Sequence, residues 1–429
     1  MPDLVPTALF GLTLLVVVGI GEALRAWGRV SPEASRRFVH AATGIVVALC
    51  PPFFSEPTGI YALAVLFVGV NLVAIRRRLF LGMHGIDRET WGTVAFPLAL
   101  IAALFLCWTL GTGNEVVPDR IYILRVAFLV LAISDPLAAW VGRRASDARG
   151  RYTIGGQTKT VAGSVAFVTS AAVLTALGLA LWAPESPVLE WSPALIAMAA
   201  VVTAVLAGAA EALGTRGWDN LWIVLAVVVG LTAVHGDARL VSFHTSPEAQ
   251  ALPLLGALVV AVAFTVFSVR IGFLDLSGGL AAGLLAWAVV ALGGVAWVVP
   301  GFTFFFASSV LSRLGKRRKR DAEARAEKGS RRDAQQVVAN GGVAGALLVA
   351  TLFAPEAWTP ALYWGFVGAF AAAAADTWGT EIGTWVGGPT RDVLRLRPVA
   401  SGESGGVSTA GSLGGIAGAL VVVGVALDG

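Results

Sequence analysis

About fourteen long apolar segments run through this sequence, and most are close to the roughly 20 residues that a helix needs to cross a bilayer. The segments are continuously apolar, whereas the strands of a membrane barrel alternate apolar and polar residues. Lipid offers no partner for backbone N–H and C=O groups, so each span is expected to be a helix. The sequence therefore predicts an all-α, polytopic transmembrane protein. The predicted spans are 4–24, 38–54, 58–75, 92–110, 121–141, 161–182, 194–213, 218–234, 251–269, 277–292, 294–312, 336–354, 359–387 and 406–427.

The low content of charged residues agrees with a membrane environment. Only 14% of the 429 residues are charged, against about a quarter in soluble domains. The first apolar segment lacks the basic start and the small-residue cleavage site of a signal peptide, so we interpret it as a span. Two cysteines, Cys50 and Cys107, are too few for a disulfide framework or a thiolate metal site. No nucleic-acid partner is expected.

Basic residues are distributed unevenly between the loops on the two sides of the predicted spans. One set of alternate loops holds 28 of the 31 Lys and Arg residues, and only Arg120, Arg125 and Arg239 lie outside it. The positive-inside rule makes the basic side cytoplasmic, which predicts an integral protein of a bacterial inner membrane with both termini outside. The polar segment 235–250 separates eight spans from six, so we predict two bundles, at 1–240 and 251–429.

Carboxylates and basic side chains gather at the predicted cytoplasmic ends of the spans, with Asp376 lying deeper. Carboxylates suit Mg²⁺, which usually bridges phosphates, and Lys and Arg suit the phosphates themselves. These groups favour phosphoryl transfer between the polar end of a lipid and a cytosolic reagent. The sequence lacks the P-loop motif, so it is not expected to be a P-loop kinase. The first half contributes Asp135, Glu211 and Asp219 with Arg36, Arg37, Arg143, Arg144 and Lys159. The second half contributes Asp376 and Glu381 with Lys316, Arg331 and Arg332.

Each of these groups also has a structural interpretation. Arg36 and Arg37 would anchor a span, and His40 would form a hydrogen bond to a neighbouring helix. Asp135 would pair with Arg143 or Arg144. Two further structural roles are the capping of a tight helix–helix turn by Glu211 and Asp219, and close helix packing by the glycine-rich segments.

Four segments of the first half resemble the phytol kinase and dolichol kinase family, whose members are membrane enzymes that phosphorylate polyisoprenoid alcohols, typically with CTP. The segments are RRFVHAATG (36–44), SDPLAAWVGRR (134–144), GGQTKTVAGSVA (155–166) and EALGTRGWDNLWI (211–223). This chain differs from the family in Ser134, where a glycine is usual, and in Trp218, where an acidic residue is expected. The resemblance implies a nucleotide and metal site lined by Asp135, Lys159, Glu211, Asp219 and Asn220.

The second half resembles a different integral-membrane family, which includes phytyl-phosphate kinase and adds a second phosphate. The segments that carry this resemblance are LDLSGGLAAG (274–283), SSVLSRLGKRRK (308–319), SRRDAQQVVANGG (330–342), ADTWGTEIG (375–383) and SGESGGVSTAGSLGG (401–415). Together the two resemblances imply a fusion of two consecutive kinases.

The predicted function is therefore a bifunctional isoprenoid alcohol kinase and isoprenyl-monophosphate kinase that uses Mg²⁺ and CTP. In the first step Asp135 orients or deprotonates the alcohol or holds Mg²⁺, and Lys159 and Arg36 neutralise the phosphoryl group. The predicted ligand-binding residues of this half also include His40, Arg143 and Asn220, with Glu211 and Asp219 as metal ligands. In the second step Asp376 and Glu381 hold Mg²⁺, brought together by a helix break at Gly379 or Gly383. The phosphate and nucleotide residues predicted there are Lys316, Arg332, Gln336, Asn340 and Ser408.

Two alternatives remain open at this stage. A CTP-dependent nucleotidyltransferase that makes a CDP-lipid would use the same site groups. A transporter or flippase for isoprenoid phosphates would place its ionisable groups near the bilayer midplane. The ionisable groups of this chain gather instead at one side of the predicted spans, which argues against a transporter.

Overall fold

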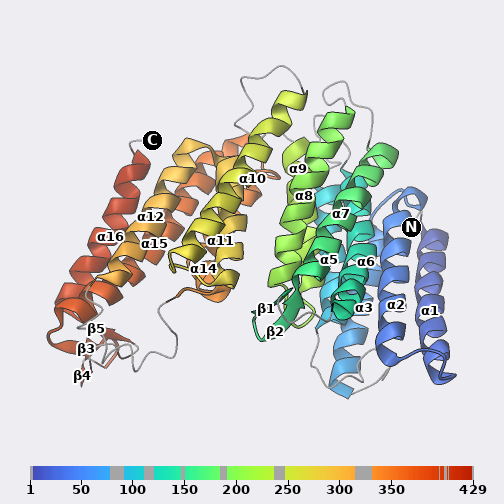
Figure 1. Ribbon diagram of the computed structural model, residues 1–429, viewed down its shortest axis with the longest axis horizontal. Helices are drawn as coiled ribbons and strands as arrows, with labels where there is room; N and C mark the ends of the chain where they lie inside the picture. Colours follow the sequence, from blue (N-terminus) through green and yellow to red (C-terminus); the bar gives the residue numbers. More distant parts are fainter. Residues whose placement is uncertain are drawn as a thin grey trace. The chain divides into compact units, whose positions relative to one another are not determined.

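In a computed structural model, the described residues are 3–77, 91–110, 120–145, 150–183, 191–235, 247–314, 331–395, 397–400, 403 and 405–427. This part of the chain holds fourteen α-helices and two small sheets (Figure 1). Ten of the helices are long and apolar enough to cross a membrane, and Asp219–Val234 and Ala334–Ala350 are shorter apolar helices. Each predicted span overlaps one of the fourteen α-helices, so the prediction of an all-α polytopic protein is confirmed, although α2 (Pro32–Leu49) and α15 (Thr359–Val386) are not among the helices that meet the criteria of length and apolarity.

The chain divides into two compact units, which consist of residues 1–236 with 244–255 and of residues 237–243 with 256–429. In the first unit α6 lies at the centre and packs against α2, α7 and α9. The helices of this unit are α1 (Leu4–Ala26), α2 (Pro32–Leu49), α3 (Thr58–Arg77), α5 (Gly92–Leu104), α6 (Ile121–Arg144), α7 (Val161–Trp182), α8 (Pro193–Leu213) and α9 (Asp219–His235).

The second unit is built around α15, which packs against α12, α14 and α16. Its helices are α11 (Leu276–Ala288), α12 (Val295–Arg313), α14 (Ala334–Ala350), α15 (Thr359–Val386), α16 (Thr409–Leu427) and the part of α10 (Pro247–Arg270) from residue 256 onward. Between α15 and α16 lies an antiparallel sheet in the order β4-β3-β5, formed by β3 (Thr390–Asp392), β4 (Pro398–Val399) and β5 (Gly406–Val407).

Local sequence signals set where α2 begins, and this start differs from the predicted one. The helix was expected from residue 38, but it starts at Pro32, which occupies the first helical position. The Ser31 hydroxyl accepts a hydrogen bond from the N–H of Ala34. Serine at the N-cap followed by proline is a common helix start. The earlier start places Glu33, Arg36 and Arg37 in the first turns of α2.

A β-hairpin joins α6 to α7 in the first unit. Strands β1 (Arg151–Ile154) and β2 (Gln157–Thr160) pair antiparallel across a two-residue turn. The turn residues, Gly155 and Gly156, have φ angles of 55° and 75°, as a type I′ hairpin turn requires at both central positions. Thr160 then caps α7 by accepting from the N–H of Gly163. The hairpin lies at the same end of the unit as the start of α2 (Figure 1).

In the second unit, α15 and α16 approach closely through small residues. A Cβ at Gly415 would lie 2.9 Å from the carbonyl oxygen of Ala375, and a Cβ at Gly418 would lie 2.9 Å from that of Ala374. Such backbone approach is typical of helix pairs in membranes, where packing rather than the hydrophobic effect holds helices together. The glycine-rich segment that begins α16 is therefore explained by packing.

Candidate functional site

A polar cavity of about 720 Å³ opens in the first unit among α2, α6, α9 and the hairpin. It is formed where the first turns of α2, α7 and α9 meet the last turns of α6 and α8. All eight site residues predicted in the first half line this cavity: Arg36, His40, Asp135, Arg143, Lys159, Glu211, Asp219 and Asn220. They come from segments more than 180 positions apart in the sequence, and the fold brings them to one place.

The hairpin carries Lys159 into the cavity, where it forms an ion pair with Glu211 at the end of α8. Lys159 Nζ lies 2.7 Å from Glu211 Oε1 and also donates to the Glu211 carbonyl oxygen. The two side chains are only 14% and 11% exposed. Because Glu211 is occupied by this ammonium group, it is less available as a metal ligand than the sequence predicts.

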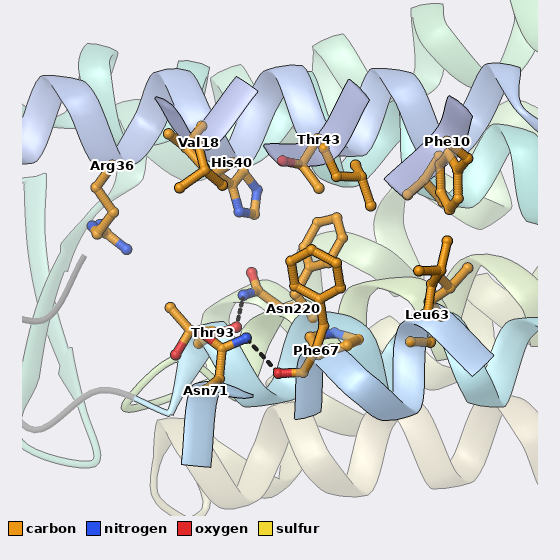
Figure 2. A pocket seen from close by; sticks show the side chains of 18 residues that line it. Phe10, Val18, Arg36, His40, Thr43, Leu63, Phe67, Asn71, Thr93 and Asn220 are labelled. Atoms are coloured by element: carbon orange, nitrogen blue, oxygen red, sulfur yellow. Dashed lines mark hydrogen bonds between the residues drawn. The ribbon is translucent and has the colours of Figure 1, made fainter. Parts of the chain in front are cut away.

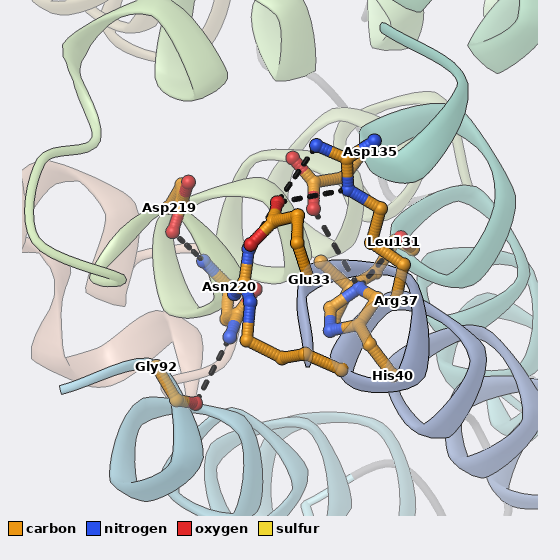
Figure 3. A network of polar contacts seen from close by, with 9 residues as sticks. Glu33, Arg37, His40, Gly92, Leu131, Asp135, Asp219 and Asn220 are labelled. Atoms are coloured by element: carbon orange, nitrogen blue, oxygen red, sulfur yellow. Dashed lines mark hydrogen bonds and ion pairs between the residues drawn. The ribbon is translucent and has the colours of Figure 1, made fainter. Parts of the chain in front are cut away.

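Asp135 on α6 faces His40 on α2. His40 Nε2 lies 3.2 Å from the carbonyl oxygen of Leu131 and 3.7 Å from Asp135 Oδ2 (Figure 3). A carbonyl oxygen can only accept, so the proton of a neutral His40 belongs on Nε2. The helices approach closely at Gly44, where a Cβ would lie 2.6 Å from the Cβ of Ala132. The suggested hydrogen bond from His40 to a neighbouring helix is therefore present.

Several charges act on Asp135 at once. Two of them, Asp219 and Glu211, are negative, and two, Lys159 and Arg36, are positive. A site that already balances carboxylates against cations can accept phosphate oxygens with little rearrangement of its own charges. The cavity therefore holds both carboxylates and cations around Asp135.

Glu33, which is not among the residues predicted from the sequence, binds the arginines at the entrance of the cavity. Its Oε1 lies 2.7 Å from Arg37 Nη2, 3.2 Å from Arg36 Nη2 and 3.5 Å from Arg143 Nη1. Arg144 instead places its guanidinium 3.7 Å from the centroid of the Trp140 ring. The suggested bridge from Asp135 to Arg143 or Arg144 is thus replaced by these contacts. The sequence could have indicated the pairing of Glu33 with Arg36 and Arg37, because these residues follow it by three and four positions, one helical turn. It could not have indicated the pairing with Arg143, which lies 110 positions away.

The turn before α9 places Asp219 and Asn220 at the cavity wall. Arg216 and Gly217 have φ angles of 53° and 90°, and a Cβ at Gly214 would lie 2.5 Å from the Cα of Asp219. Asn220 Nδ2 donates to the carbonyl oxygen of Gly92 over 2.9 Å (Figure 3). The starts of α5 and α9 are therefore tied together beside the cavity.

A second, apolar pocket of about 120 Å³ adjoins the polar cavity. It lies among α1, α2, α3 and α5, and it shares four lining residues with the polar cavity: Arg36, His40, Gly92 and Asn220. Figure 2 shows Arg36, His40 and Thr43 on one side of this pocket and Leu63, Phe67 and Asn71 on the other. A single wall therefore separates a charged compartment from a hydrocarbon compartment.

In the second unit, Arg332 and Asn340 line an apolar pocket of about 260 Å³ among α10, α11, α12, α14 and α15. The backbone of Arg332 bonds to Phe273 and Asp275, and its Nη2 lies 3.4 Å from Ser312 Oγ. Burial lowers the pKa of the Arg332 guanidinium, while the nearby charge of Glu381 acts in the opposite direction. The charge of Glu381 is therefore felt at Arg332, the other residue predicted for this site.

Other residues predicted in the second half have structural partners or lie elsewhere. Gln336 forms a capping box with Asp333 at the start of α14, in which its Oε1 accepts from the Asp333 N–H over 3.2 Å. Ser408 Oγ accepts from the N–H of Gly411 at the start of α16. Lys316 lies outside the described residues.

The expected helix break between Asp376 and Glu381 is wrong. Helix α15 runs continuously from Thr359 to Val386, through both Gly379 and Gly383. Five residues of an α-helix rotate by about 500°, so the two carboxylates point in directions about 140° apart. Asp376 is exposed and Glu381 is half-buried. The charge of Glu381, and not that of Asp376, acts on Arg332.

The fit of Mg²⁺ differs between the two units. Among the described residues, no three His, Cys, Asp or Glu side chains converge as a ready metal site. Mg²⁺ is, however, commonly held by one or two carboxylates together with substrate phosphates. Asp135 and Asp219 line the same cavity and suit that mode of binding. In the second unit the charge of Glu381 acts on Arg332, and Asp376 points about 140° away from Glu381 on the same helix, so the two do not form the expected pair of ligands.

Comparison with known proteins links the second unit to a family of membrane proteins. Residues 259–428 match the family model described as "Integral membrane protein DUF92". "Protein PGR" of Arabidopsis thaliana is 30% identical over 186 residues, which are 41% of this chain and 63% of the relative. An uncharacterised membrane protein of Synechocystis sp. is 31% identical over 140 residues, or 33% of this chain and 53% of the relative. The chain thus spans less than two thirds of either relative's length. Together with its apolar helices, these similarities make this protein an integral membrane protein.

A more distant relative has a name that specifies a reaction. "Probable phytol kinase 3, chloroplastic" of Glycine max is 26% identical over 236 residues, which are 53% of this chain and 72% of the relative. No solved structure matches the chain.

Proposed function

We propose that the first unit is a kinase that transfers a phosphoryl group to the hydroxyl of a long-chain prenyl alcohol. The observation that carries this proposal is the wall shared by the polar cavity and the apolar pocket. An alcohol with a hydrocarbon tail would place its hydroxyl at that wall and its first carbons in the pocket. The distant similarity to a probable phytol kinase supports the same substrate class.

The residues of the cavity divide the chemistry between them. The alcohol oxygen attacks the terminal phosphorus of a nucleoside triphosphate, which we take to be CTP, and the nucleoside diphosphate leaves. Asp135 accepts the hydroxyl proton, with His40 beside it. Lys159 and Arg36 stabilise the charge on the transferring group. Asp219 would hold a Mg²⁺ ion together with the phosphates, and the ion would neutralise phosphate charge when bound.

The second unit would then add a second phosphate to the product. Arg332 lies at the wall of an apolar pocket, where a guanidinium suits the phosphate of a prenyl monophosphate. Glu381 lies near enough to act on Arg332. The protein would in this way be a fusion of an alcohol kinase and a prenyl-phosphate kinase.

Product masses test this reaction and its alternatives. The purified protein is incubated in lipid nanodiscs with Mg²⁺, CTP or ATP, and phytol, geranylgeraniol or farnesol. We expect the monophosphate and then the diphosphate. Transfer of CMP instead of phosphate would show a nucleotidyltransferase. No nucleotide turnover, with movement of labelled prenyl phosphate across the bilayer, would show a transporter. Either result would overturn the kinase proposal.

We further infer that the polar cavity faces the cytoplasm of a bacterial inner membrane. Its basic lining residues belong to the loops that hold 28 of the 31 Lys and Arg residues, and such loops stay inside. Cysteines introduced at Thr245 and Arg325 report on opposite sides after Cys50 and Cys107 are replaced. In intact cells an impermeant maleimide should label position 245 and not position 325. The reverse pattern would invert the topology.

A further inference from the structure

We propose that the apolar pocket among α1, α2, α3 and α5 is the binding site for the hydroxyl-bearing isoprene unit of the substrate, and that its width selects prenyl alcohols. The ligand class is a primary alcohol with a short branched hydrocarbon unit next to its hydroxyl. This inference rests on the proposed function, because the phosphorylated group is taken to be that hydroxyl.

Apolar side chains line much of the pocket. Helix α1 contributes Phe10 and Leu14, helix α3 contributes Ala64 and helix α5 contributes Leu100, and each is at least 94% buried. Water gains few hydrogen bonds in a space of this kind, and apolar cavities stay dry and bind small hydrocarbons. The pocket is therefore suited to an alkyl or alkenyl group rather than to a sugar or a base.

The size of the pocket limits what it can hold. An engineered apolar cavity of about 150 Å³ holds one benzene molecule, and this pocket measures about 120 Å³. One five-carbon isoprene unit matches that volume, and a whole phytyl chain does not. The remaining units must leave the pocket. Helix α1 offers a route into lipid, because only 17% of its apolar stretch is buried against the rest of the protein.

Charged and hydrogen-bonding groups mark the end of the pocket that adjoins the cavity, and Asn71, which also lines the pocket, donates its own hydrogen bond to the carbonyl oxygen of Phe67. Arg36, His40 and Asn220 belong to both spaces, and the buried Thr93 hydroxyl has no hydrogen-bond partner among the described residues. Thr43 follows His40 by three residues and faces the pocket (Figure 2). A bound alcohol is thereby aligned, with carbon toward Leu100 and oxygen toward Asp135 and His40.

Two alanines on α3 supply a matched pair of variants. Ala64 is 3% exposed and lines the pocket, whereas Ala62 is exposed on the outer side of the same helix. Ala64→Leu fills part of the pocket, and Ala62→Leu adds the same atoms outside it. We expect Ala64→Leu to lower kcat/KM for prenyl alcohols at least tenfold, and Ala62→Leu to change it less than twofold. Thr43→Phe, from the opposite wall, should act like Ala64→Leu.

Photolabelling tests occupancy without relying on turnover. The probe is a prenyl alcohol with a diazirine on its hydroxyl-bearing unit, applied to full-length protein in nanodiscs, and labelled peptides are mapped by mass spectrometry. Labels should fall on the parts of α1, α2, α3 and α5 that line the pocket, and Ala64→Leu should remove them while Ala62→Leu keeps them. Thermal unfolding of each variant shows that the fold is retained.

The outcomes separate this inference from the proposed function. Pocket labelling without any phosphorylation by the wild-type protein would support the binding site and overturn the kinase proposal. Phosphorylation that Ala64→Leu and Thr43→Phe leave unchanged, with labels only on lipid-facing surfaces, would overturn the binding site and leave the kinase proposal standing.

Discussion

At the scale of single residues, the cavity is governed by charges that are buried together. Lys159 and Glu211 are nearly enclosed and lie 2.7 Å apart, so each one neutralises the other. Asp135 has no such close cation, and His40 is its neighbour at 3.7 Å. An enclosed charge without a partner is strongly unfavourable. A substitution in the cavity can therefore lower activity in two ways, by removing a group that takes part in the reaction and by destabilising the fold through an unpaired buried charge. Experiments must separate these two effects.

The Lys159–Glu211 pair allows that separation. Lys159→Met should destabilise the protein by about 3–5 kcal/mol, because it leaves the Glu211 carboxylate buried without its cation, and should lower alcohol phosphorylation by about 100- to 1000-fold. Adding Glu211→Gln removes the unpaired charge. We expect the double variant to regain most of the thermal stability but not the activity, as measured by thermal unfolding and by product mass spectrometry.

Arg144→Met is the control for this experiment, because Arg144 is a basic residue at the end of α6 that packs on Trp140 rather than lining the cavity. Its activity should stay within a few-fold of wild type. Recovery of activity in the double variant would show that Lys159 acts through folding alone.

At the scale of elements, most of the helices follow from hydrophobicity, but the elements that place Lys159 and Glu33 do not. Apolar runs predict helices because lipid forces a helical backbone, and each of the fourteen predicted spans overlaps an α-helix. The hairpin was not predicted, although Gly155 and Gly156 stand between short polar–apolar segments, which is a hairpin signal. The start of α2 was predicted six residues late, since Arg36 and Arg37 lower the local hydrophobicity while Ser31 and Pro32 determine the helix start.

The hairpin turn gives a prediction at this scale, because its two glycines differ in their surroundings. A Cβ at Gly155 would lie 2.7 Å from Thr215 Cγ2, whereas a Cβ at Gly156 meets nothing within 4 Å. Both have positive φ angles, which cost an L-residue about 1–2 kcal/mol. Gly156→Ala should therefore reduce activity only mildly, and Gly155→Ala more, because it also displaces Thr215 beside the site.

Asparagine tolerates positive φ, so Gly156→Asn should behave nearly as wild type in the assay of alcohol phosphorylation. Equal activity of Gly155→Ala and Gly156→Ala would show that the contact with Thr215 has no part in placing Lys159.

At the scale of the whole molecule, the two units differ in how well sequence patterns predict their sites. In the first unit all eight predicted residues line one cavity. Their motifs lie at helix ends on the same side of the predicted membrane, and helix ends on one side of a bundle lie close together. In the second unit the expectation for Asp376 and Glu381 depended on a broken helix, and α15 is continuous. Glycine in α15 serves contact with α16, as at Gly379 and Gly411. A sequence alone does not distinguish a glycine that breaks a helix from one that admits a neighbour.

If each unit performs one phosphorylation, the two activities should be lost separately in the intact chain. Asp135→Asn should abolish phosphorylation of the alcohol, with a loss on the order of a thousandfold, and leave conversion of supplied monophosphate to diphosphate unchanged. Glu381→Gln should do the reverse, so that monophosphate accumulates from the alcohol. Asp376 was predicted to share the role of Glu381, but it is exposed while Glu381 acts on Arg332. We therefore expect Asp376→Asn to reduce the second step less than Glu381→Gln does.

Each variant carries its own control, because the step assigned to the other unit reports that the protein is folded in the membrane. The measurement is the amount of alcohol, monophosphate and diphosphate at fixed times, with either alcohol or monophosphate supplied. Loss of both steps in a folded Asp135→Asn variant would mean one composite site that draws on both units. A larger effect of Asp376→Asn than of Glu381→Gln would mean that the second reaction takes place on the exposed face of α15 and not at the Arg332 pocket. Two separate sites are the simpler arrangement, since each unit has its own apolar pocket with an arginine in its wall.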